Sequence, residues 1–274
     1  MRRKLTILWT IFILNTGAVI LSFAGQLWQP LSFIEAPMYG FVIGLPVIQT
    51  ILHSSWTILP KRAVLLLGLA CIIGFVSEVT GIHFGSVFGV VYVYRATPVM
   101  ILGVPIEVIL FWGAFIYMGY SITNSLVLWS GRALPSFKNK AVGTLLILIF
   151  LDAAFVTAID IFMDPIQVKN GAWIWLQKGP YFGIPLTNFS GWFLVAGLTS
   201  AIFRTIQYWF PTHDKTLPPS VLLIPVLSYG FMALSFAVSA FLDGMVGLMI
   251  IGLSVTLPQT ILSLFTYYKF RSIS

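Results

Sequence analysis

Long apolar runs separated by short polar segments dominate this chain. A helix that crosses the hydrocarbon core of a bilayer needs roughly 17 to 25 apolar residues. Eight such runs can be drawn, at residues 5–25, 39–59, 63–77, 103–129, 142–163, 190–209, 220–241 and 245–268. The third run is short, and the Gly-rich stretch after it can extend it. The pattern predicts an all-α fold, a polytopic membrane helix bundle of about eight transmembrane helices.

The composition agrees with this pattern. Hydrophobic residues make up 58% of the chain and charged residues 8%, and the mean hydropathy is +0.97. A soluble domain of this size could not cover its surface with so few polar groups. No linker or low-complexity segment divides the sequence, so we expect a single integral membrane domain over residues 1–274.

The basic residues are distributed unevenly between the predicted loops, and this asymmetry predicts how the helices are oriented in the membrane. The positive-inside rule places the loops richer in Lys and Arg in the cytoplasm. With a cytoplasmic N-terminus, the residues inside are Arg2, Arg3, Lys4, Lys61, Arg62, Arg132, Lys138, Lys140, Arg204, Lys215, Lys269 and Arg271. Only Arg95, Lys169 and Lys178 then lie outside. We therefore predict a multi-pass protein of the cell membrane with both termini in the cytoplasm.

The net charge of +7 needs no nucleic-acid partner. It follows from the topology and from contact with anionic lipids. The single cysteine, Cys71, lies in an apolar run, so no disulfide is expected. His53 and His213 fall on the predicted cytoplasmic side, and no His-x-x-x-His pair accompanies His83. We predict no metal site.

A short motif occurs twice with an offset of 80 residues. Gly103-Val-Pro105-Ile precedes Trp112, and Gly183-Ile-Pro185-Leu precedes Trp192, each after a long outer loop rich in Gly and aromatic residues. Two parallel repeats around an axis along the membrane normal would place a site between the halves. Alternatively, the two matches reflect only the usual position of proline at a helix start.

Carboxylates inside the apolar runs are the first candidates for chemistry, because a charge at bilayer depth is costly and is usually functional. Asp152 lies near the middle of the fifth run. Asp160 follows about 80° round the helix and ~12 Å further out, with Asp164 one turn beyond it. Alternatively, Asp160 and Asp164 are hydrated at the interface, and Asp152 pairs with Ser, Tyr or Trp donors of another helix.

Glu78, Glu107 and His83 lie at the ends of predicted helices. Glu78 is at a C-terminal end, where the helix dipole disfavours a negative charge, so its presence suggests function. Glu107 is in a first turn, where the dipole favours a carboxylate for structural reasons alone. His83 lies among Gly81, Gly85 and Gly89, and a lone histidine is more often structural than catalytic.

Aromatic residues gather in and after the second outer loop, at Trp173, Trp175, Tyr181, Phe182, Phe189 and Trp192. Trp and Tyr commonly form a belt at the membrane interface. Electron-rich rings also stabilise cations, and a polyene substrate would need a long apolar groove.

Two blocks of sequence carry a resemblance to a known family. The first reads Glu78-x-x-Gly-x-x-Phe-Gly85, followed by Tyr92-x-Tyr94 and Gly103-Val-Pro105. The second reads Trp173-x-Trp175, then Tyr181-Phe-Gly-Ile-Pro-Leu-x-Asn188-Phe-x-Gly-Trp192. Over roughly residues 78–192 the chain resembles the membrane carotenoid-biosynthesis proteins, whose characterised members are cofactor-free hydratases of the CruF type.

The resemblance implies that water is added to the terminal isopropylidene double bond of an acyclic carotenoid, giving a tertiary alcohol. It implies an enzyme of the bilayer without a cofactor, which can associate with other carotenoid-biosynthesis enzymes. The candidate catalytic residues are then Asp152, Asp160, Glu78 and Glu107. The candidate substrate-binding residues are His83, Tyr92, Tyr94, Trp173, Trp175, Tyr181, Asn188 and Trp192.

Hydration of an alkene assigns roles to these groups. A carboxylic acid must protonate the less substituted carbon, and aromatic faces and carboxylate charge must hold the resulting tertiary carbocation while a base directs water to it. Burial favours the protonated form of a carboxyl group, so the sequence suggests Asp152 as the acid and Asp160 or Glu78 as the group that orients water. Tyr92, Tyr94, Trp173, Trp175 and Trp192 would flank the cation.

Two other classes of membrane protein remain as alternatives to a hydratase. Asp160-x-x-x-Asp164 resembles one aspartate-rich motif of UbiA-type membrane prenyltransferases, although the second motif that holds magnesium is missing. A small transporter with an aspartate near the midplane would also suit eight helices and a parallel repeat, but it would not explain the aromatic outer loops.

The predicted orientation can be tested with reporter fusions. Fusions after Ser136 and after the C-terminus should behave as cytoplasmic, and a fusion near Lys169 as external, because the basic loops stay inside. An external C-terminus would require an odd number of spans and would contradict the prediction.

Overall fold

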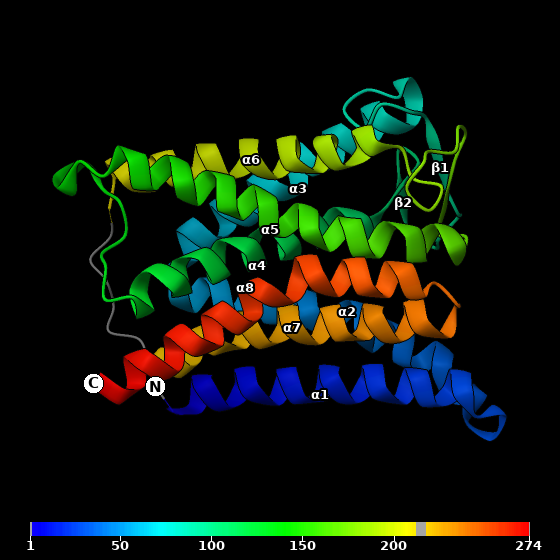
Figure 1. Ribbon diagram of the computed structural model, residues 1–274, viewed down its shortest axis with the longest axis horizontal. Coiled ribbons are helices and arrows are strands. Elements are labelled where there is room, and N and C mark those ends of the chain that lie inside the picture. Colours follow the sequence, from blue (N-terminus) through cyan, green and yellow to red (C-terminus); the bar gives the residue numbers. More distant parts are fainter. Residues whose placement is uncertain (1, 212–217, 274) are drawn as a thin grey trace. The chain divides into compact units, whose positions relative to one another are not determined.

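The computed structural model describes residues 2–211 and 218–273, so that His213 and Lys215 lie outside the described residues. Long helices account for most of the chain (Figure 1). The eight α-helices are α1 (Arg2–Leu27), α2 (Glu35–Thr57), α3 (Pro60–Phe84), α4 (Ile106–Trp129), α5 (Val142–Lys169), α6 (Leu186–Trp209), α7 (Pro219–Leu242) and α8 (Val246–Ile273). Two 3-10 helices, η1 (Gln29–Ile34) and η2 (Phe137–Asn139), connect some of them.

The helical prediction is confirmed. Seven helices in the described part of the chain, α1 and α3 to α8, are long and apolar enough to cross a membrane. The protein is therefore a multi-pass membrane protein. The remaining helix, α2, carries Pro46, Gln49 and His53 within its apolar run. The short third run is indeed extended, because α3 continues through Glu78 to Phe84.

The chain divides into two compact units, Met1–Val64 and Leu65–Ser274. In the first unit, α1 packs against α2, and η1 joins them. The second unit holds the rest of α3 and the helices α4 to α8. The single domain expected from the sequence stays a prediction.

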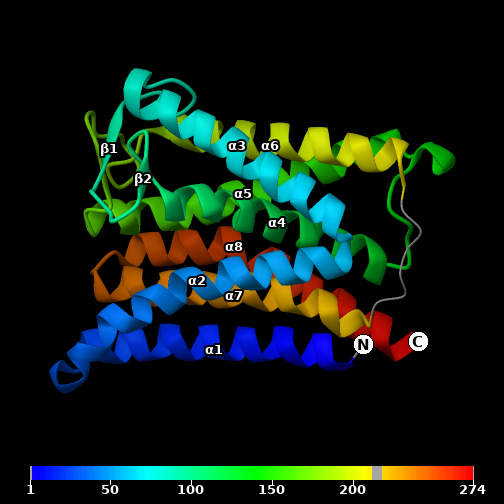
Figure 2. The same ribbon diagram turned by 180° about the vertical axis from the view of Figure 1, so that it is seen from behind.

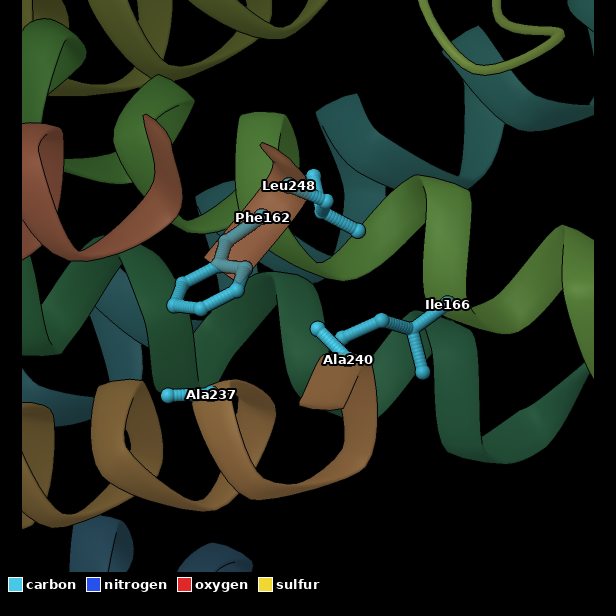
Figure 3. Packing of buried hydrophobic residues seen from close by; sticks show 5 residues of the cluster. All are labelled: Phe162, Ile166, Ala237, Ala240 and Leu248. Carbon is cyan, nitrogen blue, oxygen red and sulfur yellow. The ribbon is translucent and has the colours of Figure 1, made fainter. Parts of the chain in front are cut away.

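Within the second unit, α5 packs along α6, α7 packs along α8, and α4 contacts α5, α7 and α8. An apolar cluster fills the space between α5, α7 and α8, and consists of Phe162, Ile166, Ala237, Ala240 and Leu248 (Figure 3). The alanines and Gly252, which abuts the Phe162 ring, let the helices approach closely. Because Phe162 and Ile166 face α7 and α8, Asp160 and Asp164 lie on the opposite side of α5.

Short strands cover one end of this unit (Figure 2). Strand β1 (Tyr92–Tyr94) pairs antiparallel with β4 (Trp173–Trp175), with Tyr92 opposite Trp175 and Tyr94 opposite Trp173. Strands β2 (Met100–Ile101) and β3 (Val104–Pro105) form a hairpin. The two long outer loops of the sequence are thus joined to each other, and we call this end of the unit the strand cap.

The two sequence motifs adopt the same backbone geometry. Leu102 and Gly103 have φ values of 48° and 83°, and Phe182 and Gly183 have 49° and 90°. Pro105 and Pro185 both precede a helix in an extended conformation, with ψ values of 139° and 135°. A left-handed pair of residues followed by an extended proline therefore leads into both α4 and α6.

Residues 80 positions apart also meet each other. The indole rings of Trp112 and Trp192 stack with centroids 4.2 Å apart, and Arg204 donates a hydrogen bond to Asn124. The antiparallel pairing of β1 with β4 is likewise what a twofold relation between the halves requires. The predicted repeat is present in the local geometry, and its two copies face one another.

Candidate active site

Glu78 is the centre of the first of two carboxylate clusters beneath the strand cap. Its Oε2 accepts hydrogen bonds from the hydroxyls of Tyr92 and Tyr94, and its Oε1 accepts one from Trp112 Nε1 at 2.9 Å. Alternate residues of a strand share a face, which is why Tyr92 and Tyr94 reach the same carboxylate. Glu78 is only 3% exposed, and all three of its donors are neutral.

The two tyrosines are fixed as donors. Burial, followed by the nearby charge of Glu78, raises the pKa of Tyr92 and of Tyr94 well above the usual value. Both hydroxyls therefore keep their protons across the physiological range. Their hydrogen bonds to Glu78 satisfy a carboxylate that the bilayer could not solvate.

Asp160 and Asp164 form the second cluster. They lie one turn apart on α5, and Asn188 Nδ2 donates to Asp160 Oδ2 at 2.7 Å and to Asp164 Oδ2 at 2.8 Å. Trp173 Nε1 donates to Asp164 Oδ1. Asn188 reaches both carboxylates because Pro185 starts α6 just before it. These donors are neutral as well.

Two buried polar atoms of this region lack a hydrogen-bond partner among the described residues. They are Asp160 Oδ1 and Trp175 Nε1, an acceptor and a donor. Asp160 is 1% exposed and Trp175 is 5% exposed. Buried polar groups are nearly always paired, so these two atoms set this region apart from most of the second unit.

Aromatic rings enclose the carboxylates. Trp175 packs against Tyr92 with centroids 4.7 Å apart, and Tyr94 meets Trp173 edge to face at 5.7 Å. The stacked pair of Trp112 and Trp192 continues this wall, with Phe115 beside Trp192. Buried and half-buried rings with fixed partners such as these do not match a simple interfacial belt.

Asp152 is separated from these clusters, although the sequence suggested one continuous acidic stripe. Arg204 Nε and Nη2 donate to its two oxygens at 2.5 and 2.8 Å. Thr123 and Ser200 also donate to it. The carboxylate is thus surrounded by donors on both oxygens, in a buried ion pair. This arrangement corresponds to the structural alternative for Asp152, with an arginine as the main partner.

Arg204 is itself held by further groups. Its Nη1 donates to Asn124 at 3.0 Å, and its guanidinium lies 4.6 Å from the centroid of the Tyr120 ring. Arg204, which the sequence places among the cytoplasmic charges, is only 3% exposed in the structure. A signal was available, because Arg204 falls inside an apolar run, one helical turn after Ser200.

The remaining predicted residues lie outside the two clusters. His83 is exposed, and its Nδ1 contacts Val79 O at 2.8 Å. Glu107 is half-buried in the first turn of α4 and takes no part in the hydrogen bonds of the clusters.

Tyr181 donates to Ile161 O, and burial raises its pKa to about 12. Trp112, which the sequence analysis did not select, is a direct partner of Glu78.

Comparison with known proteins gives one match. A family model described as carotenoid biosynthesis protein matches residues 38–258, which include both carboxylate clusters and the Asp152–Arg204 pair. No curated protein and no solved structure matches the chain.

The ion pair should behave as one unit in stability measurements. Asp152→Asn or Arg204→Gln alone should lower the unfolding free energy by about 3–5 kcal/mol, because each leaves an uncompensated buried charge. The double variant Asp152→Leu/Arg204→Met should lose less than the two single losses combined. Thermal unfolding of the purified protein in detergent measures this, with Asp243→Asn, outside the network, as the control. If the double variant loses as much unfolding free energy as the two single variants together, the pairing is contradicted.

Proposed function

Because the chain belongs to the carotenoid biosynthesis protein family, we propose that it is a carotenoid hydratase, which adds water to the terminal isopropylidene double bond of an acyclic carotenoid. The observation that carries the proposal is the unpaired, buried Asp160 Oδ1 beneath the strand cap. It lies in a cluster whose hydrogen-bond donors are neutral, next to a wall of aromatic rings. Such a site combines an acid with a surface for a cation.

Asp160 is the proposed proton donor. An acid must have an oxygen that the protein does not already occupy, and Asp160 Oδ1 meets this condition in contrast to Asp152. Desolvation favours the neutral form of a carboxyl group, and Asn188 gives Asp160 a neutral partner where Arg204 gives Asp152 a cation. The acid role suggested for Asp152 therefore passes to Asp160, and Asp152 becomes a structural residue.

The reaction then follows from the groups present. The Asp160 proton is transferred to the less substituted alkene carbon, and the positive charge develops on the tertiary carbon. A water molecule that accepts a hydrogen bond from Trp175 Nε1 attacks this carbon. The proton that it loses returns to the Asp160 carboxylate, so the enzyme is regenerated without a cofactor.

The cation is stabilised by the fixed charges and rings around it. Glu78 and Asp164 accept hydrogen bonds on both of their oxygens, in contrast to Asp160, and such bonds favour the charged form. They would supply negative charge in a site of low dielectric, where it is most effective. Trp112 and Trp192 present electron-rich faces, and the bond from Trp112 Nε1 to Glu78 holds the first ring in place. The remaining polyene would lie along the apolar, lipid-facing surface of the helices.

Expression in a carotenoid-producing host tests the activity. We expect pigments heavier by one or two waters than the host carotenoid, and formation of the product without added magnesium. Asp160→Asn should reduce the rate by roughly 10²–10⁴-fold, since an amide cannot act as the acid. Asp243→Asn, at the end of α7, should leave the rate unchanged. Full activity of the Asp160→Asn protein would refute the acid assignment, and an unchanged pigment profile of the wild type would refute the hydratase itself.

Trp192 tests the stabilisation of the cation. A ring over a cation in a desolvated site contributes on the order of 2 kcal/mol, so Trp192→Leu should lower turnover roughly thirtyfold. Substrate binding should persist, because the interaction develops mainly in the transition state. Trp192→Phe should recover part of the loss, and Trp209→Leu, an exposed position, serves as the matched control. If Trp192→Leu hydrates normally but inserts poorly, Trp192 is a membrane anchor.

A further inference from the structure

A stripe of polar side chains runs along one face of α8. Thr256, Thr260, Ser263 and Tyr267 follow at intervals of three and four residues, which puts them on the same side of the helix. Each of the four is at most 9% exposed. At 1.5 Å per residue the stripe is about 16 Å long. It therefore forms a buried polar seam along α8.

Two hydroxyls of this stripe differ from the others in α8. Thr256 donates to Gly252 O, Ser254 to Ile251 O and Thr266 to Leu262 O, each at 2.7 Å. This is the usual way in which a helix satisfies a hydroxyl. Thr260 Oγ1 and Ser263 Oγ are buried and have no hydrogen-bond partner among the described residues.

Trp129, at the end of α4, adds a third group of the same kind. Its ring packs against Tyr267 with centroids 5.0 Å apart, and its buried Nε1 also lacks a partner among the described residues. In the described part of the second unit, the buried side-chain atoms without partners thus fall into two groups. Asp160 and Trp175 belong to the strand cap, and Trp129, Thr260 and Ser263 belong to this seam.

The seam leads away from the strand cap. Near the start of α8, Gly252 abuts Phe162 of α5, and beyond it the stripe continues toward the end of the unit where α4 finishes at Trp129. The Thr260 side chain lies against α7, since a Cβ at Gly230 would be 2.8 Å from Thr260 Cγ2 and 3.5 Å from Thr260 Oγ1. Its helix, α8, also contacts α4 and α5.

We propose that Thr260, Ser263 and Trp129 line a site for ordered water, in the half of the bundle away from the strand cap. Leaving a hydroxyl or an indole N–H dry and unpaired costs a few kcal/mol, whereas a buried water typically makes two to four hydrogen bonds to such groups. Two hydroxyls, each donor and acceptor, and one N–H donor match that requirement. A cation would find no carboxylate among these three residues. The site does not depend on the proposed hydration reaction.

Hydroxyl radicals generated by X-ray radiolysis of water test the site in the intact wild-type protein. Radicals formed from an internal water oxidise the side chains beside it, and mass spectrometry measures the rate at each residue. We expect Trp129 to be oxidised about tenfold faster than Phe162, although both are buried, because only Trp129 would border water. If Trp129 is oxidised as slowly as Phe162, the proposal is overturned.

A variant separates internal water from bulk solvent near Trp129. Thr260→Val/Ser263→Ala removes both hydroxyls with little change in shape and should lower oxidation of Trp129 about threefold, because the water loses its partners. Phe162 should keep its slow rate, which shows that the variant is folded. Thr256→Val, at a hydroxyl that already donates to the backbone, is the matched control. If oxidation of Trp129 is the same in the double variant and the wild type, bulk solvent is its source and the proposal is wrong.

Discussion

A carboxylate inside a bilayer cannot be solvated by its surroundings, so the protein must supply every hydrogen bond that water would have made. Four buried carboxylates of this chain meet that constraint in two ways. Asp152 receives a cation, Arg204, and becomes part of a compensated pair. Glu78, Asp160 and Asp164 receive neutral donors from tyrosine, tryptophan and asparagine. The partner therefore distinguishes Asp152, which is held in an ion pair, from the three carboxylates whose partners are all neutral.

The internal repeat explains how the neutral donors reach their carboxylates. Tyr92 and Tyr94 follow their acceptor Glu78 by 14 and 16 residues. Trp173, in the strand that also holds Trp175, follows its acceptor Asp164 by nine residues. Pairing of β1 with β4 then brings both sets of aromatic residues over one site. The halves are no longer equivalent, however. Glu78 has donors on both oxygens, whereas Asp160 Oδ1 is left without one among the described residues.

Much of this architecture is readable from the sequence, because hydropathy and proline-glycine signals are local. The apolar runs located the helices, and the offset of 80 residues identified two motifs whose backbone angles at Leu102–Gly103 and Phe182–Gly183 agree. Partners were harder to predict, since they depend on which helix faces lie together. The charge count placed Arg204 among the cytoplasmic residues although it falls inside an apolar run. Trp112 stands at the position of the repeated motif that Trp192 occupies, but the motif alone does not show that its ring faces Glu78. Asp152 and Asp160, about 80° apart on α5, face different neighbours for the same reason.

The proposed hydration would require water to be present once and otherwise excluded, and the strand cap is suited to that demand. The strand cap covers the carboxylates with Tyr92, Tyr94, Trp173 and Trp175, so bulk water is kept from the site by rings instead of by a mobile loop. Among the described residues of this site, one unpaired acceptor, Asp160 Oδ1, and one unpaired donor, Trp175 Nε1, would limit how many small polar molecules can be held. The same rings that exclude water are those best able to face a cation, so the exclusion of solvent and the stabilisation of charge follow from one set of side chains.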